Sequence, residues 1–587
     1  MTLNNEKEAT HLFHEGTNYY AYNYMGAHIE KNGCVCFRVW APNAECVYLV
    51  GDFNSWSNSC PMKKITEDGI WEIDLSSDSV PQGSLYKYKI ITHDGKSLYR
   101  ADPYAKCLPP LPESASVLNF DQDFEWHDGG WLSNRRKTMT GEDALSRPIN
   151  IYELNPVSWK KKNDGLLYSY ASLARELAPY VKQMGYTHIN LLPISLSNDL
   201  RCGICSYYAP ESVLGSQEEF RELVDTMHTA GIGVMLTVAP MQFSDAEHGL
   251  CRFDGKPIYE DIKRNEVQCF YVSCAVYWLK QYHIDGISVD LAELKREDRI
   301  SFMEKLSSAV SAEVPDALVV AYDRGDHKDV ERKSKNSLAC SLNIDVDRAN
   351  DVRFYLEKDG IYRKFHHSSL TDAVEKSDGG RSIVSVSYAD VALGKRSLLG
   401  GMFGSYDEKF ASERAFLGYM MTSRGKKLLF MGAEIGQFKE WDAKGETEWF
   451  LLSYEKHTQM QRYVCDLNMF YLENKALWEN DAENGSFEWL DKNCSDLSII
   501  SYKRTDKDKN DLYIIINFTP ILRKNYKLST NKKATFIEVF NSDNVKYGGG
   551  GIANRGEIKP SAPPKSRHFE ICVNVPPLSV VILKKIK

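Results

Sequence analysis

Acidic side chains lie at or just beyond the ends of three short apolar segments of the chain. They are Asp290, Asp323 and Asp390. Two carboxyl groups placed close together can divide the work of catalysis, one acting as a nucleophile or base and the other as a proton donor. If the three segments are strands of one barrel, their carboxyl ends meet at the same face, where such chemistry takes place. The three acids are therefore candidates for acid–base and nucleophilic roles.

Two other motifs carry reactive side chains but predict no metal or cofactor site. Cys202 and Cys205 have CxxC spacing, yet no second pair or histidine cluster is nearby, so we interpret them as ordinary thiols. His366 and His367 have no further ligand at suitable spacing, so we expect them at the surface or in hydrogen bonds. The sequence thus predicts no metal and no cofactor.

The elements that would position the acids follow a β-α rhythm from about Pro148. Helical stretches separate most of the strands; one opens with the capping-box pair Ser216 and Glu219 and then places Phe220 on its apolar face. Eight such units predict an α/β fold with a (β/α)8 barrel over residues 146–483. The eight strand candidates are Asn150–Leu154, His188–Pro193, Gly233–Val238, Gly286–Leu291, Leu318–Tyr322, Ala339–Ile344, Ile383–Ser387 and Lys427–Met431.

Short alternating segments flank this region on both sides and predict β-sandwiches over residues 1–145 and 484–587. The glycine run from Tyr547 to Gly551 is expected to be a flexible loop. The N-terminal strand candidates are Val35–Trp40, Cys46–Val50, Trp71–Leu75 and Leu85–Ile90. The C-terminal candidates are Phe487–Leu490, Leu497–Lys503, Leu512–Phe518, Phe536–Phe540, Ile571–Val575 and Val580–Lys584.

Composition narrows the class of protein. The net charge of -8 weighs against nucleic acid as a partner, since phosphate binding favours a basic face. The sequence contains no apolar run long enough to span a membrane, and residues 1–10 lack the apolar core of a signal peptide. Fourteen scattered cysteines are typical of reduced thiols, so a cytoplasmic location is expected. Aromatic residues make up 12%, which is compatible with carbohydrate binding.

Motifs distributed over more than 500 residues resemble the glycogen or starch branching enzymes of the α-amylase superfamily. Their order along the chain is more specific than any one of them. They are Trp40–Ala44, Gly51–Trp56, Tyr86–Tyr88 and Ala101–Ala105 in the first domain, Ile151–Leu154 and Gly425–Glu434 in the barrel, and Phe540–Asp543 and Pro576–Ser579 near the end. The resemblance implies an N-terminal carbohydrate-binding module and an α-glucan, such as glycogen or starch, as partner.

The family's three catalytic carboxylates map onto the ends of strands four, five and seven. The resemblance places Asp290 at the nucleophile position. Tyr322 stands where the family has its acid/base Glu, and Ala389 where it has the third carboxylate. Asp323 and Asp390 each come one residue later, and because successive strand residues face opposite sides, neither simply substitutes unless a bulge redirects it.

Other positions of the family's site differ as well. Ser288 replaces the Arg beside the nucleophile, and Tyr388 and Gln242 replace two His residues. Thr237 stands for an Asp of strand three and Ile204 for a Tyr that stacks under the sugar. The departures gather at one face while the scaffold motifs persist, which is typical of a retained fold without the ancestral reaction.

The resemblance also places ligand-facing residues in the first domain at Trp56, Lys87 and Tyr99. The alternative for Trp56 is a ring packed against the barrel. Near the barrel strand ends, Glu153 and Glu434 are interpreted as structural.

We therefore hypothesise a catalytically inactive branching-enzyme homologue that binds α-glucan or assists an active glycogen enzyme. Two alternatives stay open. One is an active 1,4-alpha-glucan branching enzyme whose carboxylates have moved to Asp323 or Asp390, with one of them about 5–5.5 Å from Asp290. The other is a protein-interaction scaffold without glucan affinity.

Overall fold

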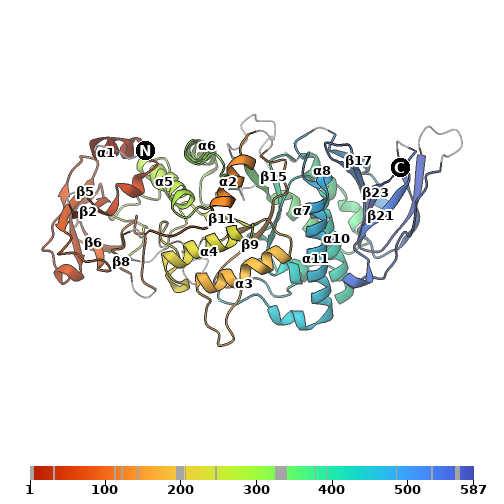
Figure 1. The fold of residues 1–587 in the computed structure, drawn as a ribbon, viewed down its shortest axis with the longest axis horizontal. Helices are drawn as coiled ribbons and strands as arrows, with labels where there is room; N and C mark the ends of the chain where they lie inside the picture. Colours follow the sequence, from red (N-terminus) through yellow and green to blue (C-terminus); the bar gives the residue numbers. More distant parts are fainter. Residues whose placement is uncertain are drawn as a thin grey trace.

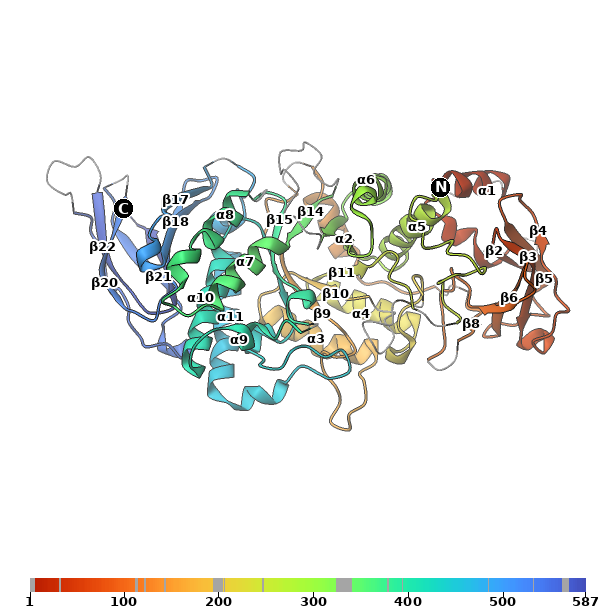
Figure 2. The same ribbon diagram turned by 180° about the vertical axis from the view of Figure 1, so that it is seen from behind.

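A computed structural model shows three parts arranged along the long axis of the molecule (Figure 1). The N-terminal strands lie at one end, the barrel in the middle and the C-terminal strands at the other end, and the reverse view shows the same order (Figure 2). The structure describes residues 6–30, 33–110, 114–120, 123–141, 144–193, 204, 206–244, 247–323, 340–376, 379–392, 394–483, 485–530, 533–561 and 569–586.

The N-terminal part contains two antiparallel sheets, as expected for a sandwich. Alternate residues of the strands, such as Phe37 and Val39 or Tyr88 and Ile90, are buried between them. One sheet has the order β1 (Gly26–Ile29), β2 (Cys34–Trp40), β5 (Ile70–Ser76) and β4 (Lys63–Lys64). The other contains β3 (Ala44–Gly51), β6 (Leu85–Thr92) and β7 (Ser97–Arg100), with β8 (Ser116–Val117) paired to β6.

The eight predicted strands form a closed parallel barrel, so the predicted fold is confirmed. The barrel closes where β16 pairs with β9, with Leu428 opposite Ile151. Its strands are β9 (Asn150–Leu154), β10 (His188–Leu191), β11 (Gly233–Val238), β12 (Gly286–Asp290), β13 (Leu318–Tyr322), β14 (Leu342–Asp345), β15 (Ser382–Val386) and β16 (Lys426–Phe430). Ala339, predicted in the sixth strand, lies outside the described residues.

Helices surround the barrel, and α4 (Gln217–Thr229) begins where the sequence predicts. In α4 the Ser216 Oγ accepts from Glu219 N at 3.2 Å and Glu219 Oε2 accepts from Ser216 N at 3.2 Å, which completes the capping box. Phe220 of this helix is fully buried. The helices are α3 (Tyr170–Gln183), α4 (Gln217–Thr229), α5 (Asn265–Gln281), α6 (Arg296–Glu313), α7 (Val346–Leu356), α8 (Ser368–Lys376), α9 (Leu398–Gly401), α10 (Tyr406–Thr422) and α11 (Glu455–Glu473).

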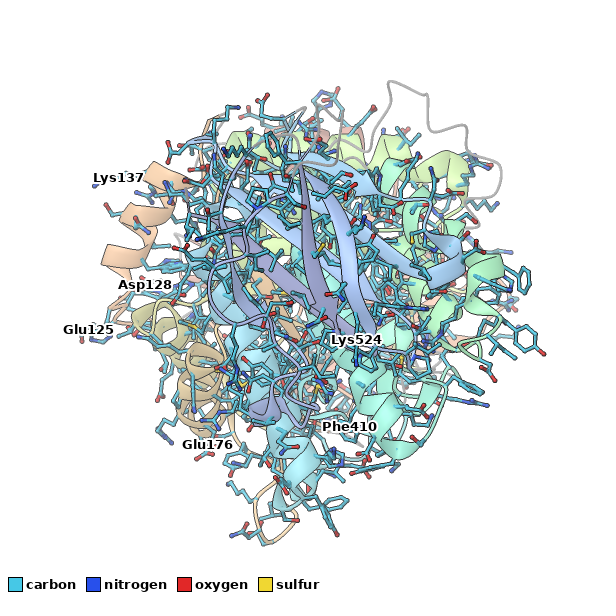
Figure 3. The ribbon with its side chains drawn as sticks, turned by 90° about the vertical axis from the view of Figure 1, so that its right-hand side faces the viewer. Glu125, Asp128, Lys137, Glu176, Phe410 and Lys524 are labelled. Atoms are coloured by element: carbon cyan, nitrogen blue, oxygen red, sulfur yellow. The ribbon has the colours of Figure 1, made fainter. Side chains whose placement is uncertain are left out.

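Two helices precede the barrel and were not predicted from the sequence. Helix α1 (Glu6–Glu15) lies beside α5, where His14 Nδ1 and Glu266 Oε1 are 2.8 Å apart. Helix α2 (Gly129–Thr138) lies on the flank of the molecule when it is viewed from the C-terminal strands, with Lys137 pointing outward (Figure 3). Ten mostly polar residues give α2 no apolar stripe that a sequence pattern would reveal.

The C-terminal part is all β, as predicted. A five-stranded sheet has the order β17 (Phe487–Asp491), β18 (Ile499–Thr505), β19 (Asp511–Asn517), β23 (Ser579–Lys585) and β21 (Phe536–Asn541). A two-stranded sheet pairs β20 (Arg523–Thr530) with β22 (Phe569–Val575). Strand β20 was not predicted, because charged residues at its start hide the alternation of buried Tyr526, Leu528 and Thr530.

The glycine run near Tyr547 is held by hydrogen bonds, and the prediction of a flexible loop is wrong. Asp543 accepts from Gly550 N at 2.8 Å through Oδ1 and from Ile552 N at 3.0 Å through Oδ2. A Cβ on Gly549 would lie 2.2 Å from the Asp543 carbonyl oxygen, so the glycine permits this close approach. The Asp543 carboxylate thus fixes the backbone of the glycine run, whose residues have no side chains of their own.

Two further sequence expectations concern the membrane and the thiols. Of the helices in the described residues, none has the length and apolar character that crossing a membrane requires. The cysteines within the described residues are free thiols. Cys202 and Cys205 of the CxxC motif lie outside the described residues.

Candidate active site

Asp290 ends β12 and is buried at the C-terminal mouth of the barrel. Its Oδ2 accepts from the Tyr388 hydroxyl at 2.6 Å, and its Oδ1 accepts from Ala292 N at 3.0 Å. Tyr388 begins the turn after β15, so the contact joins two strands that are far apart in the sequence. The candidate nucleophile is thus held by two neutral donors.

Tyr322 ends the neighbouring strand β13 and also points into the mouth. Its hydroxyl is hydrogen-bonded to Ser387 Oγ, and its ring packs edge-on against Tyr388 with 6.2 Å between centroids. Tyr388 packs in the same manner against Trp441, again at 6.2 Å. Aromatic rings therefore line the position to which the resemblance assigns the acid/base.

Asp390 lies in the same turn as Tyr388 but serves the backbone of that turn. Its Oδ2 accepts from both the backbone N and the Oγ of Ser387, each at 2.8 Å. Burial raises the pKa of this carboxyl above its usual value, while the Ser387 hydrogen bonds act in the opposite direction. Ala389, next to it, is buried and brings only a methyl group.

Asp323 faces away from the mouth. It follows Tyr322 directly, and its carboxylate forms an ion pair with Arg299 of α6 on the outside of the barrel. Arg299 is itself fixed by a hydrogen bond from Nε to the Leu294 carbonyl at 2.9 Å. Because successive residues of a strand point to opposite sides, the inward Tyr322 places Asp323 outward.

Glu153 of β9 also reaches the mouth, although the sequence alone indicated a structural role. Its Oε2 accepts from Tyr388 N at 2.8 Å, and its Oε1 accepts from Asn190 Nδ2 at 3.1 Å. Asn190 also donates to Thr237 Oγ1 at 3.0 Å, so the residue at the position of the family's strand-three Asp belongs to this chain of hydrogen bonds. The sequence signal for Glu153 is an acidic residue within an apolar strand. Its contact with Tyr388 could not be predicted, because only the folded barrel brings the two residues together.

The remaining barrel positions are occupied by packed or hydrogen-bonded groups. Ser288 is buried within β12, and Ile204 is buried with its N–H donating to the Gln242 carbonyl at 2.7 Å. Glu434 accepts from the hydroxyls of Tyr152 and Tyr180 at 2.7 and 2.8 Å, and burial raises its pKa.

The paired histidines lie apart from the mouth. His367 Nε2 is 2.9 Å from the Lys492 carbonyl, and burial lowers the pKa of this ring. His366 packs edge-on against Phe354. The described residues contain no group of three or more His, Cys, Asp or Glu side chains placed to hold a metal ion.

The three candidate glucan-binding residues lie in the N-terminal part. Trp56 follows the end of β3 in a left-handed conformation (φ 58°), is 37% exposed, and donates from Nε1 to Asp52 at 3.1 Å. Tyr99 of β7 is equally exposed. Lys89, which the sequence did not single out, lies opposite Tyr99 in the sheet with Nζ 5.5 Å from the ring centre. Lys87 shares this face of β6 and donates to Ser114 Oγ at 2.7 Å.

Comparison with known proteins gives full-length relatives. The 1,4-alpha-glucan branching enzyme GlgB of Halothermothrix orenii is 37% identical, with 98% of each chain covered. The enzyme of the same name from Nitrosomonas eutropha is also 37% identical, covering 98% of this chain and 84% of its own. The chain belongs to the 1,4-alpha-glucan branching enzyme family.

Domain profiles and solved structures agree with this family. Residues 24–105 match carbohydrate-binding module 48 (isoamylase N-terminal domain), and residues 489–586 match the alpha amylase C-terminal all-beta domain. A type I pullulanase from Bacillus subtilis, solved with maltose, has a TM-score of 0.70 at 18% identity, covering 96% of this chain and 85% of its own. A putative alpha amylase from Salmonella typhimurium has a TM-score of 0.68 at 16% identity, covering 95% of this chain and 99% of its own. The branching-enzyme family member therefore has the α-amylase-type architecture throughout.

Proposed function

We propose that this branching-enzyme family member binds α-glucan without forming branches, and so assists or regulates an active glycogen enzyme. The observation that carries the proposal is Tyr322 at the end of β13, hydrogen-bonded to Ser387 where the resemblance assigns the general acid. Phenols titrate near pH 10, far from the range in which an acid/base catalyst exchanges protons at neutral pH. Loss of such a group typically costs on the order of 10²–10⁴ in rate.

The contacts of Asp290 support the same proposal. In the described residues its carboxylate receives hydrogen bonds from Tyr388 and Ala292. A Ser at position 288 supplies neither the charge nor the fork of donors that an Arg provides. A phenol at the acid/base position is a poor proton donor to the leaving oxygen, and retaining transfer requires such a donor.

The rival hypothesis is an active branching enzyme with relocated carboxylates. Asp390 supports it only weakly, because its Oδ2 is engaged by Ser387. Asp323 does so still less, since it pairs with Arg299 outside the barrel. Burial keeps the pKa of Asp390 raised, which is the property of a general acid, so Asp390 is the residue to test first.

Incubation with amylose followed by debranching and chain-length analysis separates the two hypotheses. We expect no α-1,6 branches above the level of a heat-denatured sample. Asp290→Asn and Asp390→Asn are the matched variants, since both keep the side-chain volume. Branch formation by the wild-type chain that either variant abolishes would establish the rival and refute the proposal.

Glucan binding is tested by migration in native gels that contain glycogen. We expect retarded migration that Trp56→Ala weakens, because an exposed indole stacks on the C–H face of a sugar ring. Ile29→Ala is the control; Ile29 is also exposed (54%) but lies on β1, in the other sheet of the same part. Unretarded wild-type migration would favour a scaffold without glucan affinity. Recovery of an active glycogen enzyme by pull-down would then be the next measurement.

A further inference from the structure

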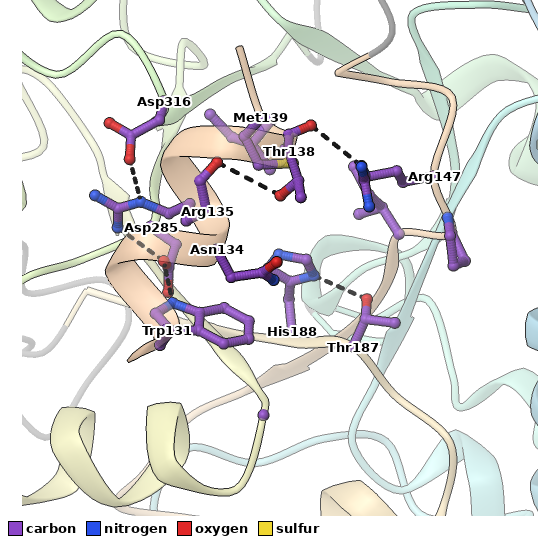
Figure 4. A pocket seen from close by; sticks show the side chains of 14 residues that line it. Trp131, Asn134, Arg135, Thr138, Met139, Arg147, Thr187, His188, Asp285 and Asp316 are labelled. Atoms are coloured by element: carbon purple, nitrogen blue, oxygen red, sulfur yellow. Dashed lines mark hydrogen bonds and ion pairs between the residues drawn. The ribbon is translucent and has the colours of Figure 1, made fainter. Parts of the chain in front are cut away.

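A cavity of about 210 Å³ opens at the N-terminal end of the barrel, opposite the mouth that holds Asp290. Helix α2 forms one wall, and the residues that begin the barrel strands form the other (Figure 4). His188 is the first residue of β10 and Leu318 the first of β13, which fixes the cavity at this end. Reactions in such barrels take place at the opposite end, so the cavity is separate from the candidate active site.

Cationic side chains pair with the acidic residues of the cavity. Arg135 of α2 donates from Nε to Asp316 at 2.9 Å and from Nη1 to Asp285 at 2.8 Å. Asp285 is also 2.8 Å from His228 Nε2 and accepts from Trp131 Nε1 at 2.8 Å. Burial alone would lower the pKa of His228, but Asp285 and Asp128 raise it to about 9, so the ring is charged at neutral pH. The cations Arg135 and His228 therefore offset part of the negative charge of Asp285, Asp316 and Asp128.

A further positive charge comes from Arg147 at the rim. Its Nε donates to the Thr138 carbonyl at 3.1 Å, and its own carbonyl accepts from Lys426 Nζ at 2.9 Å. These bonds fix the position of the residue while the two Nη groups make no further hydrogen bond within the described residues. A guanidinium presented in this manner suits a phosphate or carboxylate.

Polar groups inside the cavity have unused hydrogen-bonding capacity. His188 Nδ1 is bonded to Thr187 Oγ1 at 2.8 Å, whereas its Nε2 has no partner among the described residues. Burial lowers the pKa of His188, so the ring is neutral and Nε2 offers one donor or acceptor to a ligand. Asn134 adds a side-chain amide from α2 on the facing wall. Met139 and Leu318 add apolar surface to the lining.

We propose that this cavity binds a nucleoside monophosphate, with the base enclosed between α2 and the barrel and the phosphate at Arg147. The size supports this assignment, since sites for whole drug-sized ligands measure roughly 300–1,000 Å³. A space of about 210 Å³ holds one planar heterocycle and leaves the anionic group at the opening. Asn134 and His188 then bond to the edge of the base, and Met139 and Leu318 cover its faces. The proposal does not depend on glucan binding.

The test is isothermal titration calorimetry of the full chain with AMP, adenosine and ribose 5-phosphate as probes. Arg147→Met should weaken AMP binding roughly tenfold through loss of a charge-assisted contact, and leave the weaker binding of adenosine unchanged. Asn134→Tyr should abolish AMP binding, because the larger side chain fills the opening. Lys137→Met is the matched control, since Lys137 lies on α2 but points away from the barrel, and it should change AMP affinity less than twofold (Figure 3).

Three outcomes would overturn the proposal. They are no heat with AMP at millimolar concentration, equal affinity for ribose 5-phosphate and AMP, and undiminished AMP binding by Asn134→Tyr. Asn134 is exposed, so its substitution should leave the unfolding temperature unchanged and a negative result would not reflect misfolding. A glycogen gel run on the same variants should be unaffected, which separates failure here from failure of the proposed function.

Discussion

Two buried aspartates stand at opposite ends of the same strand, β12, and have different partners. Asp285 directly precedes the strand and is bonded to the cations of Arg135 and His228, each at 2.8 Å. Asp290 ends the strand and is bonded to the neutral Tyr388 hydroxyl and Ala292 N–H. One end of the barrel thus compensates a buried charge with opposite charges, whereas at the other end a phenol and a backbone N–H donate to the carboxylate.

This difference indicates what each end of the barrel does. The cations around Asp285 outweigh its burial and hold its pKa well below the usual range, so its charge is an integral part of the packing of α2. At the mouth, Tyr322, Tyr388 and Ser288 occupy positions where the resemblance implies a Glu, a His and an Arg. The ion pairs of Asp285 thus lie at the end remote from the candidate active site.

The largest expected loss of stability is that of the Asp285→Asn variant. Asp285→Asn leaves Arg135 and His228 without their buried counter-charge, which should lower the free energy of unfolding by roughly 3–5 kcal/mol. Asp290→Asn is the matched change at the other end and should cost less than about 1.5 kcal/mol, since Tyr388 and Ala292 donate to it as neutral groups. Urea unfolding monitored by tryptophan fluorescence measures both. Equal losses would remove the distinction between the two ends.

The next effect concerns pH. The folded pKa of His228, raised to about 9, lies above its unfolded value of about 6.5, so its contribution is complete below pH 6.5. That contribution is lost as the pH rises toward 9, on the order of 2 kcal/mol. Thermal unfolding between pH 6 and 9.5 should show the decline, and His228→Gln should flatten it. A decline of the same size in the variant would assign it to other groups.

A smaller loss is expected for the phenol at the mouth. Tyr388→Phe removes the 2.6 Å hydrogen bond to Asp290 while the ring keeps its packing, which should cost about 1 kcal/mol. Tyr322→Phe provides the comparison, because it removes a hydroxyl bonded to neutral Ser387. Differential scanning calorimetry distinguishes them. A Tyr388→Phe loss approaching that of Asp285→Asn would show that the mouth, too, depends on this one charge.

The smallest change in stability is expected for Trp56→Ala in the N-terminal part. Trp56→Ala should alter the free energy of unfolding by less than about 0.5 kcal/mol, since the ring is partly exposed and its hydrogen bond to Asp52 lies at the surface. The same variant should migrate faster in glycogen gels. Loss of retardation accompanied by marked destabilisation would assign the effect to folding and not to a glucan contact.

The order of strands and helices follows from the sequence. The barrel strands are short apolar runs, and the helix between β10 and β11 has its capping box at Ser216 and a buried face at Phe220. These signals are local, because backbone hydrogen bonding and burial repeat with a fixed period along each element. The resemblance in turn depended on the order of short motifs such as Trp40–Ala44 and Gly425–Glu434, against which Tyr322 and Ala389 stand out as departures.

Only the tertiary structure decides which of these side chains meet. Tyr388 reaches Asp290 across 98 residues, and Arg135 reaches Asp285 across 150, from a helix without an apolar stripe. The sequence by itself therefore determined the barrel, its flanking sheets and the replaced groups at the mouth. The partners of the two aspartates, and the cavity beneath α2, depend on closure of the barrel, which brings the ends of distant strands within hydrogen-bond distance.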